Sequence, residues 1–167
     1  VIGASNKTFN LAGLHLSHFV AEDEALRTKL KHGIAAAGYS QPNVLSLVAS
    51  QAAYEKEGKW LDELIDYLHA NTKYAVDFVN AKIPGARTAH PEGTYLIWTD
   101  VSRLIAAKGL KDDRELVSRL CDDARVRFTA GSIFGAEGKG FIRINVACPR
   151  AQLAEGLERF AAWAAKN

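Results

Sequence analysis

Methionine is absent from these 167 residues, and cysteine occurs only twice. Cys121 and Cys148 lack the C-x-x-C spacing of a redox or zinc site, so we interpret them as buried thiols in a reducing, cytoplasmic compartment. No apolar run approaches the ~18 residues that a membrane-spanning helix needs. The first residues lack the pattern of a signal peptide. A chain without an initiator methionine is predicted to be a fragment or a processed product.

A dominant charge is lacking as well. The net charge is +2, and lysine and arginine are scattered among aspartate and glutamate, which excludes a basic surface for nucleic acid. Among the histidines only His15 and His18 are closely spaced, and on a strand their side chains would point to opposite faces. We therefore predict no metal site. A hydrophobic content of 48% is typical of a globular protein with a sizeable core.

The first half of the chain contains one strand pattern and two helix patterns. Residues 14–20 alternate between apolar and polar and predict a strand. Asp23 is the expected N-cap of a helix that ends near Gly33 or Gly38, and a second helix is expected over about 44–57. A single strand is not stable alone in water, so its partners are expected from outside this segment.

A long helix is predicted next, between Trp60 and a stop at Pro84, after Gly58 has closed the preceding helix. More than twenty residues is long for a globular helix, whose mean length is about 11–12, and a helix of this length often bridges two structural units. Its apolar stripe consists of Leu61, Leu64, Ile65, Leu68, Ala75, Val76 and Val79.

The second half reads as a compact α+β unit, with a few strands and with helices packed on one face of the sheet. We expect strands at 95–99, 126–129 and 141–147, and helices at 113–123 and around Leu153, Leu157, Phe160, Ala161 and Ala164. Together these patterns predict a mixed α/β and α+β chain. Residues 1–58 would be the incomplete tail of a larger α/β domain, and residues 59–167 a small C-terminal domain with its linking helix.

Lys7 is the first candidate for chemistry. It lies among small and hydroxyl residues, including Ser5 and Thr8, just before the predicted strand. A lysine whose amine is desolvated there loses its proton more readily and can attack a carbonyl to form a Schiff base. The alternative is a solvated loop lysine, since most lysines are exposed.

Arg143 is the second candidate. Strand alternation sends Ile142, Ile144 and Val146 to one face and Arg143 to the other. An arginine within an apolar strand is costly unless its guanidinium meets an anion. That anion is either a neighbouring Asp or Glu in a structural salt bridge, or a ligand.

Two segments carry a resemblance to a known family. The run Lys7-Thr8-Phe9-Asn10-Leu11-Ala12-Gly13-Leu14 resembles the segment around the lysine that binds pyridoxal 5'-phosphate (PLP) in the fold-type I aminotransferase superfamily (class I/II). Within it, the run is most similar to the cystathionine β-lyase branch of MalY/PatB-type C–S lyases. Residues 140–150 are similar to the family strand whose arginine binds the substrate α-carboxylate, and residues 131–135 to the loop that helps to close the site.

The resemblance implies a role for each candidate residue. Lys7 would bind PLP covalently, give way to the substrate amine, and then move a proton at the substrate α-carbon. Ser5 and Thr8 would bind the cofactor phosphate, although Asn6 stands where relatives commonly carry Ser or Thr. Arg143 would bind the α-carboxylate, and Arg150 would be structural. The resemblance also implies a homodimer whose interface lies near residues 39–43.

The implied activity is α,β-elimination from cystathionine or a related cysteine derivative, giving a thiol, pyruvate and ammonia. Transamination is the alternative, because both reactions share their first steps. In the family, the acid that pairs with the PLP ring nitrogen and the aromatic residue that stacks on the ring precede the lysine. We therefore expect this chain alone to be inactive, as the C-terminal part of a longer enzyme. A non-catalytic fragment that serves in binding or dimerisation is the remaining alternative.

Overall fold

The computed structural model describes residues 1–39 and 41–166. The chain divides into two compact units, Val1–Ile65 and Asp66–Asn167, which we describe separately. The segment 39–43, which the resemblance places near a dimer interface, includes Ser40, and Ser40 lies outside the described residues.

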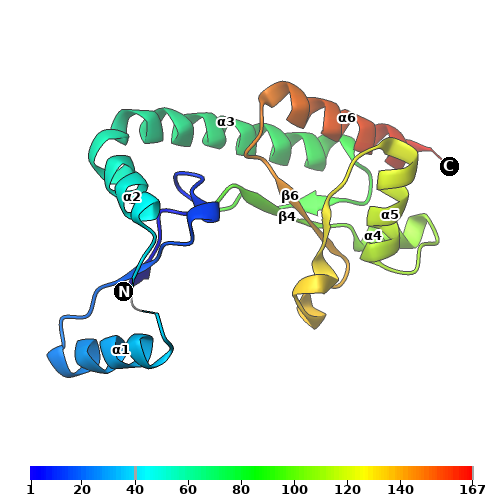
Figure 1. Ribbon diagram of the computed structural model, residues 1–167. Coiled ribbons are helices and arrows are strands. Elements are labelled where there is room, and N and C mark those ends of the chain that lie inside the picture. The colour runs from blue at the N-terminus through cyan, green and yellow to red at the C-terminus, as the bar shows by residue number, and fades with distance from the viewer. Residues whose placement is uncertain (40, 167) are drawn as a thin grey trace. The chain divides into compact units, whose positions relative to one another are not determined.

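The first unit begins with a short antiparallel pair of strands (Figure 1). β1 (Ile2–Gly3) pairs with β2 (His18–Phe19). The strand predicted over 14–20 is therefore mostly wrong. Leu14 ends the 3-10 helix η1 (Ala12–Leu14), and His15 has a left-handed backbone with a φ of 52°, so the chain becomes extended only near β2.

The helices α1 and α2 follow the sequence pattern closely. α1 (Glu24–Ala36) is capped by Asp23, whose carboxylate accepts a hydrogen bond of 2.6 Å from the backbone N–H of Leu26, which confirms the predicted cap. α2 (Val44–Lys56) is capped by Asn43. The prediction that Gly58 closes α2 is wrong in one respect, because Gly58 also begins the next helix.

α3 (Gly58–Lys82) is the long helix that the sequence predicts, and it contributes residues to both units. Its predicted apolar stripe is buried at Ala75, Val76 and Val79. Ile65 remains 40% exposed, and Leu61, Leu64 and Leu68 are half-buried, so the described residues cover the earlier part of the stripe only in part. No helix in the described part of the chain is long and apolar enough to cross a membrane.

The second unit is built on a four-stranded antiparallel sheet with the order β3-β4-β6-β5. The strands are β3 (Arg87–Thr88), β4 (Leu96–Asp100), β5 (Thr129–Ala130) and β6 (Phe141–Asn145). The predictions at 95–99 and 141–147 are confirmed. The strand predicted at 126–129 shifts to β5, because the backbone N–H of Val126 still bonds to the carbonyl of Leu120 in the preceding helix.

One face of this sheet is buried by helices. Ile97 on β4 and Ile142 and Ile144 on β6 are at most 1% exposed, and they belong to one hydrophobic core. The helices that contribute to this core are α3, α4 (Ser102–Ala107), α5 (Asp113–Ala124) and α6 (Arg150–Ala165). The other face carries the alternate side chains, Trp98 and Arg143 among them, whose Cα atoms lie opposite each other in the ladder.

A buried asparagine joins α3 to the chain that follows β6. Asn71 is fully buried, and its amide donates hydrogen bonds of 2.9 Å to the carbonyls of Val146 and Cys148. Its carbonyl oxygen accepts one of 2.7 Å from Nε of Arg150, and the Arg150 guanidinium also lies 4.6 Å from the ring centroid of Tyr74. Arg150, the first residue of α6, therefore connects α6 to α3.

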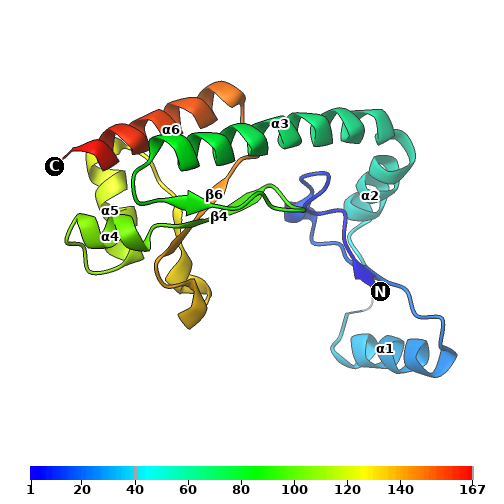
Figure 2. The same cartoon turned by 180° about the vertical axis from the view of Figure 1, so that it is seen from behind.

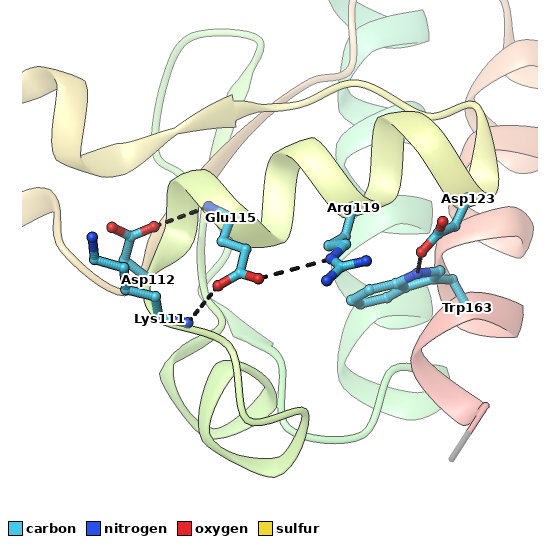
Figure 3. Close-up of polar contacts among 6 residues, drawn as sticks. All are labelled: Lys111, Asp112, Glu115, Arg119, Asp123 and Trp163. Atoms are coloured by element: carbon cyan, nitrogen blue, oxygen red, sulfur yellow. Dashed lines mark hydrogen bonds and ion pairs between the residues drawn. The ribbon is translucent and has the colours of Figure 1, made fainter.

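Polar contacts along α5 fix both of its ends (Figure 3). Asp112 caps the first turn by accepting a hydrogen bond from the N–H of Glu115, whose carboxylate lies 3.8 Å from Arg119. At the other end, Asp123 accepts a hydrogen bond of 3.1 Å from the indole N–H of Trp163 on α6. These polar side chains of α5 therefore have structural roles.

Candidate functional site

Lys7 lies in a tight turn in the first unit. The carbonyl of Ser5 accepts a hydrogen bond from the N–H of Phe9, and the carbonyl of Asn6 accepts one from Leu11, both at 3.0 Å. Lys7 and Thr8 are exposed, whereas Ser5 is only 2% exposed. Residues 1–39 and 41–166 provide no ion-pair partner for the Lys7 ammonium. The described residues therefore leave the amine accessible rather than desolvated.

Two contacts position this turn. The Phe9 ring meets Tyr54 edge-on, with 5.4 Å between the centroids, and stacks on Trp60 at 6.1 Å. These contacts hold the residue two positions after Lys7 against α2 and the start of α3. They fix the turn from one side and leave the side chain of Lys7 free.

A buried oxygen beside Lys7 lacks a donor. Oδ1 of Asn6 is inaccessible to water, and no described residue donates a hydrogen bond to it. Buried polar atoms are nearly always paired, because an unpaired one loses its hydrogen bonds to water. The turn around Lys7 therefore lacks a hydrogen-bond donor to Oδ1 of Asn6 among the described residues.

Arg143 lies on the open face of the sheet in the second unit. Its Cα atom is opposite that of Trp98 on β4 and that of Thr129 on β5, so it occupies the middle of the sheet. The side chain is half-buried, and the carbon of its guanidinium lies 4.7 Å from the ring centroid of Phe134. The alternative of a structural salt bridge is not found within the described chain, where no carboxylate pairs with Arg143.

The loop that precedes β6 is held by a buried carboxylate. Asp113 is 1% exposed and accepts hydrogen bonds from the N–H of Ser132 at 2.9 Å and of Gly140 at 3.3 Å. The two ends of the loop are thereby tied to the first residue of α5. Gly131 and Gly138 approach so closely that a Cβ atom on either would overlap the backbone of the other.

These contacts set the pKa of Asp113. Burial by itself raises this pKa, but hydrogen bonds from the N–H and hydroxyl of Ser132 and from the N–H of Gly140 outweigh burial and hold the pKa below its ordinary value of 3.8. Asp113 is therefore ionised at neutral pH while it holds the loop. Burial also raises the pKa of the Cys148 thiol. Within the described residues, no group of three His, Cys, Asp or Glu side chains is arranged to bind a metal ion.

Asp113 is expected to give the fold a component of acid sensitivity. Because its folded-state pKa is depressed, its contribution to the free energy of unfolding is fully present above the ordinary carboxyl pKa and is lost as pH falls through the folded value. Urea unfolding between about pH 5 and pH 2 should show a decline in this free energy that is smaller in Asp113→Asn. Asp122→Asn, an exposed neighbour on α5, should keep the wild-type decline. Equal declines in both variants would contradict this account.

Nearly the whole chain matches a known protein family. The sequence model of the family "Aminotransferase class I and II" matches residues 1–160, so the chain belongs to this family. The family and the mixed α/β and α+β fold predicted from the sequence are thereby confirmed.

Two individual proteins and one solved structure are similar to this chain over nearly its whole length. The chain is 38% identical over 159 residues to cystathionine beta-lyase PatB of Bacillus subtilis, covering 95% of this chain and 40% of that protein. It is 34% identical over 158 residues to the protein MalY of Escherichia coli, covering 94% of this chain and 39% of that protein. The crystal structure of the PLP-bound C-S lyase from Staphylococcus hominis superposes with a TM-score of 0.88 at 33% identity, covering 99% of this chain and 42% of that one. The chain thus spans about 40% of the length of the relatives it matches.

Proposed function

We propose that this chain is the C-terminal part of a PLP-dependent enzyme that acts on amino acids, a C–S lyase of the cystathionine β-lyase type. The reaction is an α,β-elimination that releases a thiol and aminoacrylate, and water then hydrolyses the aminoacrylate to pyruvate and ammonia. The similarity to PatB over 95% of the chain carries this proposal. The family match over residues 1–160 supports it, because that range includes both Lys7 and Arg143. The small-molecule substrate is cystathionine or a related cysteine derivative.

The donor set around Lys7 fits PLP. An accessible amine without an ion-pair partner suits the aldehyde of the cofactor, and the hydroxyls of Ser5 and Thr8 suit its phosphate, Thr8 being the exposed one. When bound, PLP supplies an electron sink for the charge that develops at the substrate α-carbon. The unpaired Oδ1 of Asn6 supports a further hydrogen-bond donor in this turn when the site is complete.

Lys7 and Arg143 then have separate roles. The Lys7 amine holds the cofactor until substrate arrives, and afterwards it takes the proton from the α-carbon as a general base. Arg143 binds the substrate α-carboxylate through two parallel N–H···O bonds, which fixes the orientation of the α-carbon. The lack of a carboxylate partner for Arg143 within the described residues supports this role.

Transamination is the second candidate, and the family model itself favours it, since it describes aminotransferases. The Lys7 and Arg143 roles are the same in both reactions. The two reactions differ after the proton has left the α-carbon. In elimination a thiol leaves from the β-carbon, whereas in transamination the proton is returned to the cofactor. A fragment without catalytic activity that serves in binding or dimerisation is the third reading.

We also propose that the whole enzyme is a cytoplasmic homodimer. α2 leaves Val44 70% exposed, Leu45 69% and Val48 60%, which supports a further protein surface over this helix. The two free cysteines support a reducing compartment.

Product analysis tests the proposed reaction. The full-length protein, meaning one that carries these residues and has the length of its relatives, is incubated with PLP and cystathionine. The expected products are a thiol, pyruvate and ammonia in equal amounts, whereas the 167 residues alone should give none. Transfer of the amino group to an added keto acid without release of thiol would establish the aminotransferase instead. Turnover by the 167 residues alone would contradict the expectation that they are inactive.

A further inference from the structure

An aromatic platform covers part of the open face of the sheet in the second unit. The ring of Phe134 lies edge-on to Trp98, with 5.8 Å between centroids and 64° between planes. Trp98 in turn stacks on Phe141 at 5.7 Å and 18°. Phe134 is 52% exposed and Trp98 38% exposed, so these rings lie outside the hydrophobic core. Burial in the core therefore does not explain the platform.

The platform contacts the guanidinium of Arg143. Phe134 is the ring beneath this group, at 4.7 Å. A guanidinium is attracted to an aromatic face by the ring quadrupole, and it can also stack on such a face. The five N–H donors lie in the plane of the guanidinium and stay available at its edge. Phe134 thus contacts the Arg143 guanidinium, and no carboxylate of the described residues forms an ion pair with it.

Phe134 lies in the loop that Asp113 binds at two points. Phe134 ends the 3-10 helix η2 (Gly131–Phe134), within the loop whose ends are bound by this buried carboxylate. Arg114 adds a hydrogen bond of 3.0 Å from its Nε to the hydroxyl of Ser132. Phe134 thus lies between the two points, Ser132 and Gly140, at which the loop is bound to Asp113.

We propose that Phe134 is a positioning residue for Arg143, and that Asp113 acts through the loop to hold Phe134 in place. Phe134 orients the guanidinium for recognition of the substrate α-carboxylate, and it has no direct part in the bond-breaking steps. The proposal rests on the proposed function, because it requires Arg143 to bind that carboxylate.

The test compares two substrates in the full-length protein with PLP bound. One is an S-alkyl cysteine, and the other is its carboxamide, which lacks the anion that Arg143 recognises. In Phe134→Leu the KM for the amino acid should rise about fivefold, with kcat within about twofold, while the carboxamide is unaffected. Phe134→Tyr keeps an aromatic face and should restore the wild-type KM. Phe78→Leu makes the same change at a half-buried site on α3 and should leave the ratio of the two substrates unchanged.

A second pair of variants tests the proposed role of Asp113 in holding the loop. Asp113→Asn should lower the preference for the amino acid as Phe134→Leu does, because a neutral amide holds the two N–H groups less strongly. Asp122→Asn removes the same charge from the exposed side of α5 and should change nothing. Melting temperatures of all variants confirm that folded proteins are compared.

The outcomes separate the inference from the function on which it rests. Arg143→Gln should abolish the preference for the amino acid over the carboxamide. If it does so while Phe134→Leu affects both substrates equally, or behaves as Phe78→Leu, the positioning role is wrong and the carboxylate role stands. If Arg143→Gln keeps the preference for the amino acid, the carboxylate role of Arg143 and the positioning role of Phe134 are both overturned. If Asp113→Asn behaves as Asp122→Asn, the anchoring role of Asp113 is wrong.

Discussion

Replacing Lys7 with alanine in the full-length protein is expected to lower kcat for elimination by about a thousandfold or more. The amine has two proposed roles, as the covalent attachment point of the cofactor and as the base at the α-carbon, and a positioned base alone contributes about a hundredfold to ten-thousandfold. Steady-state release of pyruvate measures the loss. The exposed position of Lys7 makes a loss of folding stability a poor explanation for such a result.

Two further variants separate the amine from its charge. Lys7→Arg keeps a cation at this position, but a guanidinium stays protonated and does not attack an aldehyde, so this variant should be as inactive as Lys7→Ala. Lys29→Ala removes an exposed lysine from α1 and should retain full activity. Substantial turnover by Lys7→Arg would show that the charge of Lys7, and not its nucleophilic amine, supports the reaction.

Replacing Arg143 with glutamine is expected to raise KM for the amino-acid substrate by about tenfold to a hundredfold. Hydrogen bonds to a charged partner contribute roughly 1.5–3 kcal/mol, and glutamine retains only part of them without the charge. The effect on kcat should be smaller, because Arg143 is not proposed to transfer a proton. Initial rates over a wide range of substrate concentration separate the two parameters.

Arg143→Lys provides the graded comparison. A lysine keeps the charge but lacks the planar pair of donors, so its KM should lie between those of the wild type and Arg143→Gln. Arg127→Gln changes an exposed arginine in the same unit and serves as the control, with an unchanged KM. A KM for Arg143→Gln equal to that of the control would place the carboxylate elsewhere.

The helices were largely predictable from the sequence because their signals are local. Asp23 caps α1 through a contact three residues away, and the spacing of Ala75, Val76 and Val79 alone indicates which face of α3 is buried. The strand over 14–20 was not predictable in its extent. Alternation does not register the left-handed backbone at His15, and a strand extends only as far as its partner, β1, allows.

The sequence indicates the two principal candidate residues of the site, and it does not indicate the contacts that surround them. The Lys7 motif and the alternation around Arg143 are continuous in sequence. The hydrogen bonds from Ser132 and Gly140 to Asp113 span 19 and 27 residues, and no local pattern indicates them. Asp113 resembles an ordinary acidic residue in the first turn of a helix, so its burial and its hydrogen bonds to the loop emerge only from the folded chain.

Borohydride reduction followed by peptide mapping tests the central claim most directly. The full-length protein is saturated with PLP, reduced and digested, and the peptide that carries the added mass of reduced PLP is sequenced by mass spectrometry. This account predicts a single modified peptide with the adduct on Lys7, and no adduct when Lys7 is replaced by alanine. An adduct confined to another lysine, or an unmodified protein after reduction, would contradict the assignment of Lys7 as the cofactor-binding residue.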